Sequence, residues 1–145
     1  MSNRSTEIKR IPIMDGLFTW PSDQPRLIAG RCRSCGTYFF PKFLVTHHPE
    51  CPQRETEEVL LSTRGTLDTY TIQRFPPPPP FVSPDPFVPY AIGWVALPEG
   101  IAVAGILTGC DLDAITLHMD LELVIEKAWV DKDGNEALTW KWRPV

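Results

Sequence analysis

The chain has 145 residues, of which 43% are hydrophobic and 22% charged, a balance typical of a soluble globular protein. The formal net charge of -4 at pH 7 argues against nucleic acid as the main partner, because contacts with phosphates need a basic surface. The first ten residues lack the apolar core of a signal peptide, and the longest apolar run, Ile101–Leu107, is too short to span a bilayer. We therefore expect a cytoplasmic protein, whose four cysteines favour metal binding over disulfides in that reducing compartment.

Three parts follow one another along the chain: an N-terminal arm over residues 1–25, a cysteine-containing segment over 26–58, and a β-rich segment over 59–145. The arm is polar and interrupted by prolines, which discourage a long helix. Its apolar residues Leu17, Phe18 and Trp20 are the side chains expected to anchor it to a surface.

The cysteine-containing segment carries a metal-binding spacing. Cys32 and Cys35 form a C-x2-C knuckle followed by Gly36, which permits the tight turn that such a knuckle needs. His48 and Cys51 repeat the same spacing with histidine in the first position. The adjacent His47 is the competing ligand, although its spacing to Cys51 is less regular.

The residues Cys32, Cys35, His48 and Cys51 thus predict a closed site of three thiolates and one imidazole, a ligand set typical of structural zinc. Zinc is favoured over iron because histidine replaces a thiolate. Such a site contributes roughly 10–16 kcal/mol of apparent binding in finger peptides, which a short ribbon needs in order to fold. The alternatives are unliganded reduced thiols and a redox-active pair, but no βαβ unit surrounds the motif.

The segment after residue 58 shows five runs rich in β-branched and aromatic residues, which predict strands over 65–72, 90–97, 101–108, 121–129 and 137–142. Turn sequences lie at 98–100 and 131–135, and residues 111–117 suit one or two helical turns. Five strands with a short helix after the third predict a mostly β chain ending in an OB-fold barrel.

A proline-rich loop interrupts the barrel over residues 75–90. Its five consecutive prolines predict a polyproline II rod, with aromatic side chains on either side. The loop either packs on its own barrel or serves as a rigid arm for a partner, which loses little entropy on docking. The residues that we expect to contact a partner are Arg74, Phe75, Phe81, Phe87 and Tyr90.

Other candidate residues have simpler interpretations. Cys110 is expected to be a partly buried thiol, His118 an exposed turn residue, and residues 131–136 a hairpin turn and not a calcium loop. No serine or cysteine has a histidine and an acid suitably placed for a nucleophilic triad, so the chain itself is not expected to be catalytic. The tryptophans are expected either in the core or as platforms on which bases stack: Trp94, Trp129, Trp140 and Trp142. Several basic residues are expected either to be solvated at the surface or to contact phosphates: Arg64, Lys127, Lys141 and Arg143.

The order of these motifs resembles an acyl-CoA-associated family built from a rubredoxin-like zinc ribbon and an OB-fold, formerly a domain of unknown function. The matching pieces cover about residues 26–145: Cys32–Gly36, Phe39–Pro41, Arg64–Thr71, Pro89–Tyr90, Leu97–Gly100, Gly109–Asp113 and Trp140–Pro144. Two positions depart from the family, which often has cysteine where this chain has His48 and glycine where it has His118.

The resemblance implies a function in a complex. Small members of the family are accessory subunits of thiolase-superfamily enzymes, such as the thiolase that cleaves benzoylsuccinyl-CoA, and others pair with hydratases or aldolases. The implied function is a non-catalytic subunit that docks on a catalytic partner and helps to form its channel for an acyl-CoA thioester. The alternative from a different class is an OB module that binds single-stranded nucleic acid.

Overall fold

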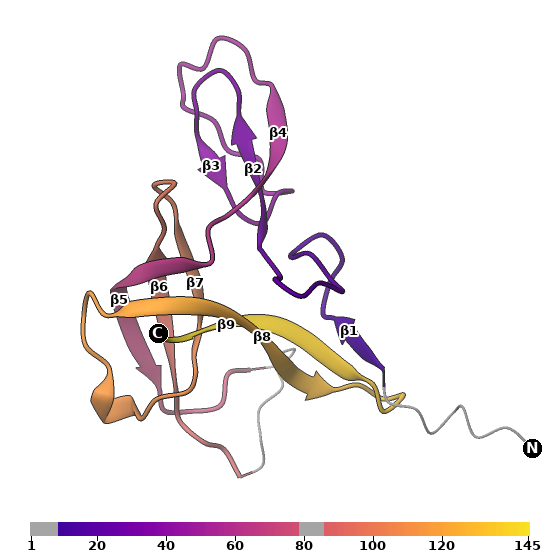
Figure 1. The fold of residues 1–145 in the computed structure, drawn as a ribbon, viewed down its shortest axis with the longest axis vertical. Coiled ribbons are helices and arrows are strands. Elements are labelled where there is room, and N and C mark those ends of the chain that lie inside the picture. Colours follow the sequence, from indigo (N-terminus) through magenta and orange to yellow (C-terminus); the bar gives the residue numbers. More distant parts are fainter. Residues whose placement is uncertain (1–8, 79–85) are drawn as a thin grey trace, which may run out of the picture.

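The computed structural model describes residues 9–78 and 86–145, and within them the larger unit is a closed five-stranded barrel. The order around the barrel is β9-β7-β6-β5-β8, and pairing of β8 with β9 closes it. This confirms the predicted OB-type barrel (Figure 1). The strands are β5 (Arg64–Gln73), β6 (Tyr90–Ala96), β7 (Ala102–Leu107), β8 (Asp120–Val130) and β9 (Glu136–Pro144).

Alternation along these strands produces the core. In β6, Ala91 and Val95 point into the barrel and are fully buried, whereas Trp94 faces outward and is exposed. Trp142 of β9 is the largest fully buried side chain. It fits because Gly105 of β7 has no side chain, and a Cβ there would lie 2.7 Å from the Trp142 ring.

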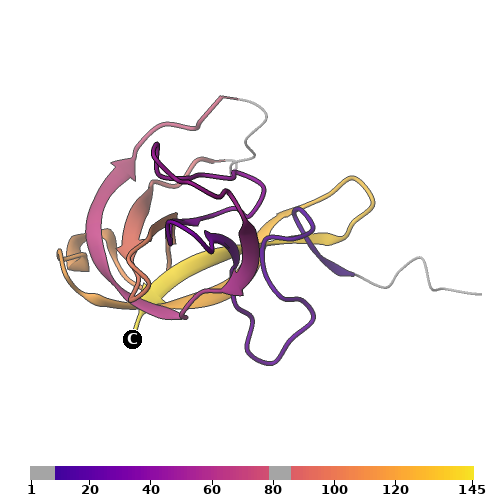
Figure 2. The ribbon, with the colours of Figure 1, turned by 90° about the horizontal axis from the view of Figure 1, so that it is seen from above.

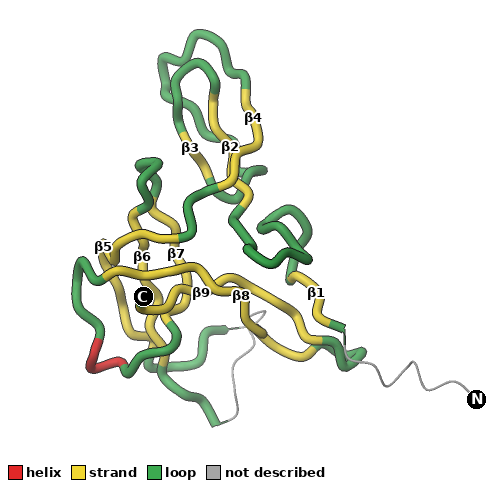
Figure 3. Tube along the Cα trace, viewed as in Figure 1, coloured by secondary structure: helices red, strands yellow, loops and turns green. Residues whose placement is uncertain are grey.

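A single short helix, η2 (Leu112–Ala114), lies between β7 and β8, where the sequence predicted helical turns. Figure 3 shows it as the one helical segment in the described part of the chain. None of the described helices has the length and apolar character that a membrane crossing requires.

The smaller unit is a three-stranded antiparallel ribbon in the order β3-β2-β4, made of β2 (Ile28–Cys32), β3 (Tyr38–Phe39) and β4 (Thr56–Leu60). It stands above the barrel in Figure 1, and Figure 2 shows it from its far end. Gly30 of β2 lies under the ring of Phe39, where any added Cβ would clash at 2.0 Å.

The N-terminal arm joins both units. Its strand β1 (Arg10–Pro12) pairs in parallel with the first residues of β9, next to the turn of the long β8–β9 hairpin (Figure 1). Leu17 and Phe18 are buried in the common hydrophobic core, as expected of anchors, and Trp20 packs against that core.

Candidate metal centre

The metal-ligating side chains come from the end of β2, the turn that follows it and the long loop between β3 and β4. Cys32 ends β2 and is buried, and Cys35 lies in the turn that leads to β3. Gly36, with a φ of 75°, lets its amide donate to the carbonyl of Cys32 at 2.9 Å and so closes this turn. His47 and Cys51 both lie in the long loop between β3 and β4.

The four side chains converge on one point. The ligand atoms of Cys32, Cys35, His47 and Cys51 all lie within 4.8 Å of one another. Sγ of Cys32 and Sγ of Cys51 are 3.6 Å apart. Two thiolates on one tetrahedral zinc, each bonded at about 2.3 Å, would be separated by about 3.8 Å. The spacing of the sulfurs therefore suits a tetrahedral ion.

The histidine whose ligand atom lies in this cluster is His47, whereas the sequence spacing had favoured His48. His47 Nδ1 is buried and has no hydrogen-bond partner among the described residues, as expected of an atom that binds a metal. His48 is exposed, and its Nδ1 accepts a hydrogen bond from the amide of Glu50 at 3.3 Å. The spacing is thus H-x3-C, because the loop turns the first of the two adjacent rings inward.

His48 nevertheless contributes through its backbone. Its amide donates to Sγ of Cys35 at 3.4 Å, and Thr37 Oγ1 lies 3.1 Å from the same sulfur. The His48 amide and then the Thr37 hydroxyl lower the pKa of Cys35 to about 5, which favours the thiolate that a metal binds. By contrast, desolvation and the neighbouring thiols raise the pKa of Cys51.

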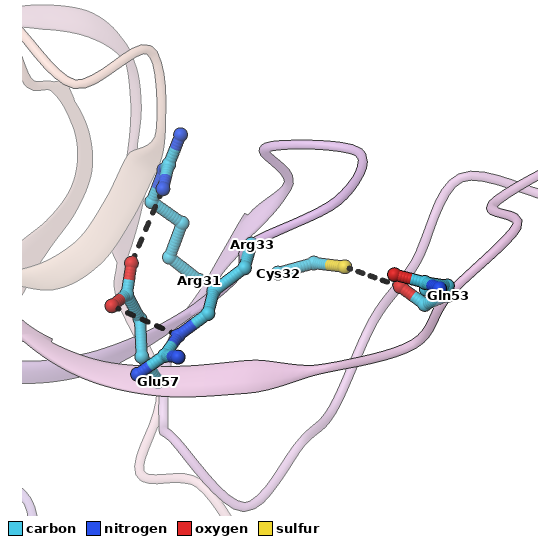
Figure 4. Close-up of polar contacts among 5 residues, drawn as sticks. All are labelled: Arg31, Cys32, Arg33, Gln53 and Glu57. Atoms are coloured by element: carbon cyan, nitrogen blue, oxygen red, sulfur yellow. Dashed lines mark hydrogen bonds and ion pairs between the residues drawn. The ribbon is translucent and has the colours of Figure 1, made fainter.

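Charged side chains lie on the other face of the strand. Cys32 points toward the carbonyl of Gln53, whereas Arg31 and Arg33 point away from it and meet Glu57 at 3.2 and 3.3 Å (Figure 4). Alternation along β2 explains the opposite directions of Arg31 and Cys32, since successive side chains lie on opposite faces, and Arg33 lies just beyond the strand. The ion pairs fasten β2 to β4 beside the cluster without occupying it.

The donor set fits zinc. Three sulfurs and one imidazole nitrogen form a closed four-coordinate set, which leaves no open position for a reacting molecule. The orphaned Nδ1 of His47 indicates that the pocket is shaped for an ion. Cys32, Cys35, His47 and Cys51 would hold it, and its contribution is to the fold of the ribbon.

Four of the five residues expected at a partner surface are described, and they lie where β5 ends and just before or at the start of β6, at the end of the barrel away from the ribbon (Figure 1). Arg74 and Phe75 follow β5, Phe75 being 77% exposed, and Tyr90 begins β6 opposite Gln73. The rings of Phe87 and Tyr90 pack edge to face at 6.0 Å. Phe81 and the last two prolines of the predicted polyproline rod, residues 79 and 80, lie outside the described residues.

Two other singled-out residues have local explanations. Cys110 packs against the core, and burial raises the pKa of its thiol. His118 is exposed with a φ of 69°, at a position where glycine is favoured. Thr37, the hydroxyl donor beside Cys35, carries no sequence signal that would have identified it.

Comparisons with known proteins agree with this architecture. Residues 20–42 match the family described as "ChsH2, rubredoxin-like zinc ribbon domain", and residues 58–126 match "ChsH2, C-terminal OB-fold domain". A DUF35 domain-containing scaffold protein of Pyrococcus furiosus is 35% identical over 121 residues, covering 83% of this chain and 84% of that protein. Its counterpart in Methanocaldococcus jannaschii is 29% identical over 126 residues, covering 82% of each.

Among solved structures, "Ltp2-ChsH2(DUF35) aldolase" superposes with a TM-score of 0.62 at 27% identity, covering 82% of this chain and 84% of that one. The resemblance that the motif order indicated is thereby confirmed, both for the zinc ribbon and for the OB-fold. The chain belongs to the family of DUF35 domain-containing scaffold proteins.

Proposed function

We propose that this protein is a non-catalytic accessory subunit of a cytoplasmic, thiolase-superfamily complex that makes or breaks a carbon–carbon bond in an acyl-CoA thioester of a degradative pathway. The observation that carries the accessory-subunit part of the proposal is the likeness, over 82% of the chain, to a DUF35 protein in a structure described as an aldolase. The membership in a family of scaffold proteins supports the same conclusion.

The chemistry of the described residues agrees with an accessory function. The four donors of the metal cluster are all needed to complete a tetrahedral shell, so the ion stabilises the fold and has no position for substrate. The catalytic nucleophile and bases are therefore assigned to the partner. This subunit supplies a rigid surface and, with the partner, walls of the channel that receives coenzyme A.

The surface assigned to this contact is the end of the barrel that carries the proline-rich loop. Phe75 and Val88 are 77% and 59% exposed there, and Arg74 offers a charge for a phosphate or an acidic partner residue. Exposed aromatic and aliphatic side chains on an otherwise polar surface are typical of protein contacts. Arg74, Phe75, Phe81, Phe87 and Tyr90 are the residues proposed to contact the partner or coenzyme A.

A related candidate is an accessory subunit of an aldolase or hydratase. The aldolase form is favoured by the description of the superposed structure. Thiolase and aldolase cleavage differ in their need for a second substrate. A thiolase cleaves with free coenzyme A, whereas an aldolase releases a carbonyl compound without it. Dependence of cleavage on free coenzyme A therefore distinguishes them.

The experiment is to purify the tagged full chain from its native host and identify what is bound to it by mass spectrometry and native mass measurement. We expect a stoichiometric thiolase-like protein, whose activity on acyl-CoA thioesters falls when this subunit is removed and returns when it is added back. A chain that runs alone as a monomer, and whose melting temperature does not respond to coenzyme A, contradicts the proposal.

Binding of single-stranded nucleic acid is the alternative from another class, because OB-folds often bind it. The net charge of -4 disfavours it. Titration of a labelled oligonucleotide at low salt decides the matter: tight, salt-sensitive binding would support this alternative, and no binding would remove it.

A further inference from the structure

A link of three residues, Leu61 to Thr63, joins the ribbon to the barrel between β4 and β5. Leu61 is fully buried, and its amide donates to the carbonyl of Leu27 at 3.0 Å. The carbonyl of Thr63 accepts from the amide of Leu123 in β8 at 2.8 Å. Backbone bonds thus fasten the first residue to the ribbon side and the last to the barrel, and leave Ser62 as the residue between them.

A carboxylate holds Ser62. The backbone amide and the hydroxyl of Ser62 both donate to Oε2 of Glu99, at 2.8 and 2.9 Å. Hydrogen bonds to an ionised carboxylate are roughly twice as strong as those between neutral groups. Two donors from one residue on one oxygen also restrict both its backbone and its side chain.

Glu99 is presented by a rigid turn. It lies between β6 and β7, where the amide of Leu97 donates to the carbonyl of Ile101 and the amide of Gly100 to that of Leu97, both at 2.9 Å. Gly100 has a φ of 92°, which closes the turn. The β6–β7 turn rises toward the ribbon in Figure 1, so the carboxylate reaches the link from the barrel side.

The remaining oxygen of Glu99 makes the contact unusual. Oε1 is buried without a hydrogen-bond partner, and Glu99 takes part in none of the ion pairs found among the described residues. Desolvating an oxygen of a carboxylate without a partner is costly. The position of the carboxylate therefore satisfies both donors of Ser62 but leaves Oε1 of Glu99 without a hydrogen bond.

Arg26, the residue that follows the arm, holds the same link. Its guanidinium donates to the carbonyl of Leu61 at 2.9 Å and to that of Leu60 at 3.1 Å. Beside these contacts lies an open cleft of about 630 Å³, lined by Arg26, Ser62, Thr63, Arg64 and Pro98 among others. The cleft leaves free space beside Ser62 and Thr63, whereas Leu61 at the start of the link is packed in the hydrophobic core.

We propose that Glu99 is a positioning residue that fixes the direction in which the ribbon stands on the barrel by holding Ser62. Apolar contacts, such as the edge-to-face pair of Phe40 and Trp140, keep the two units together but are less directional. The two hydrogen bonds to Glu99 are directional and act on the connecting residue itself. This assignment depends neither on the proposed partner nor on its reaction.

Residual dipolar couplings of backbone amides in the zinc-loaded full chain test the proposal, because they report the relative orientation of two folded units. In the wild type, one alignment tensor should fit ribbon and barrel together. Glu99→Gln keeps an acceptor oxygen for Ser62, so one alignment tensor should still fit both units. Glu58→Ala is the matched control: it removes an exposed carboxylate of the ribbon that is paired only with Lys42, and one tensor should fit this variant as well. Glu99→Ala should require separate tensors for the two units.

Retained amide dispersion and zinc content would show that both units of each variant are still folded. A single tensor with wild-type orientation in Glu99→Ala would overturn the proposal. If that variant does not fold, Ser62→Ala is the second test, because it removes the hydrogen bond of the hydroxyl and keeps that of the amide. A measurable change in the orientation of the ribbon relative to the barrel supports the proposal. An unchanged orientation overturns it.

Discussion

The backbone amide of His48 donates a hydrogen bond to Sγ of Cys35 at 3.4 Å, while the His48 ring lies outside the cluster and is exposed. Of two adjacent histidines, one therefore offers its ring to the metal and the other only its peptide group. The division follows from the path of the loop between β3 and β4, which directs successive side chains to different sides.

His47→Ala should lose zinc, whereas His48→Ala should retain it, because only the first substitution removes a ligand atom. Loss of a ligand should lower zinc affinity by more than the roughly 10–100-fold that removal of an outer-shell partner costs. Competition with a chromophoric chelator measures the affinity, and the Co²⁺ spectrum reports the donors. A His48→Ala variant that loses zinc as readily as His47→Ala would contradict the ligand assignment.

Thr37→Val should weaken the site without removing a ligand. The hydroxyl of Thr37 lies 3.1 Å from Sγ of Cys35 and helps to lower the pKa of that thiol to about 5. Without it the pKa rises, protons compete better with the metal, and the pH at which half of the zinc is lost should move upward. A pH titration of zinc retention measures this midpoint, with Thr46→Val as a control because that hydroxyl bonds only to the carbonyl of Leu44.

The strands of the barrel could be predicted from the sequence, whereas the histidine of the metal cluster could not. The five strands follow from β-branched runs separated by turns, and the observed β5 to β9 lie where those runs are. The C-x2-C knuckle with Gly36 likewise identifies the ribbon. These signals are local, and the fold preserves them.

The features that sequence spacing could not supply depend on the path of the chain in space. The regular H-x2-C spacing favoured His48, but the path of the loop, which the sequence does not reveal, turns the ring of His47 inward in an H-x3-C spacing. The parallel pairing of Ile11 with Ala137 joins residues 126 positions apart and leaves no periodic pattern in a three-residue strand. The bond from Ser62 to Glu99 is likewise a tertiary contact between two ordinary turn residues.

Removal of the metal should unfold the ribbon and leave the barrel. Few residues of the ribbon sheet are buried, whereas the barrel strands supply most of the common hydrophobic core, including Leu67, Val95 and Trp142. A strong chelator should therefore collapse the amide dispersion of residues 28–60 while strands β5 to β9 keep their shifts. Loss of both units together would show that the zinc site also supports the barrel.

Gly105→Ala should destabilise the barrel by about 1–3 kcal/mol, the range for overpacking a core. An added Cβ would lie 2.7 Å from Cδ1 and 2.9 Å from Nε1 of Trp142, and 3.1 Å from Nε1 of Trp140. Chemical denaturation followed by tryptophan fluorescence measures the loss. Ala102→Ser, at an exposed position of the same strand, is the control and should change the free energy of unfolding by less than about 0.5 kcal/mol.

His118→Gly should stabilise the protein, in contrast to most glycine substitutions. His118 has a φ of 69°, a conformation that costs a residue with a Cβ about 1–2 kcal/mol. The larger unfolded-state entropy of glycine offsets about 0.5–1 kcal/mol of that gain. The amide of His118 donates to the carbonyl of Leu67 at 2.8 Å, a bond that glycine retains, so the free energy of unfolding should rise by up to about 1 kcal/mol. Leu117→Gly, one residue earlier where φ is negative, should lower it, and equal losses in both variants would show that the backbone at His118 is not strained.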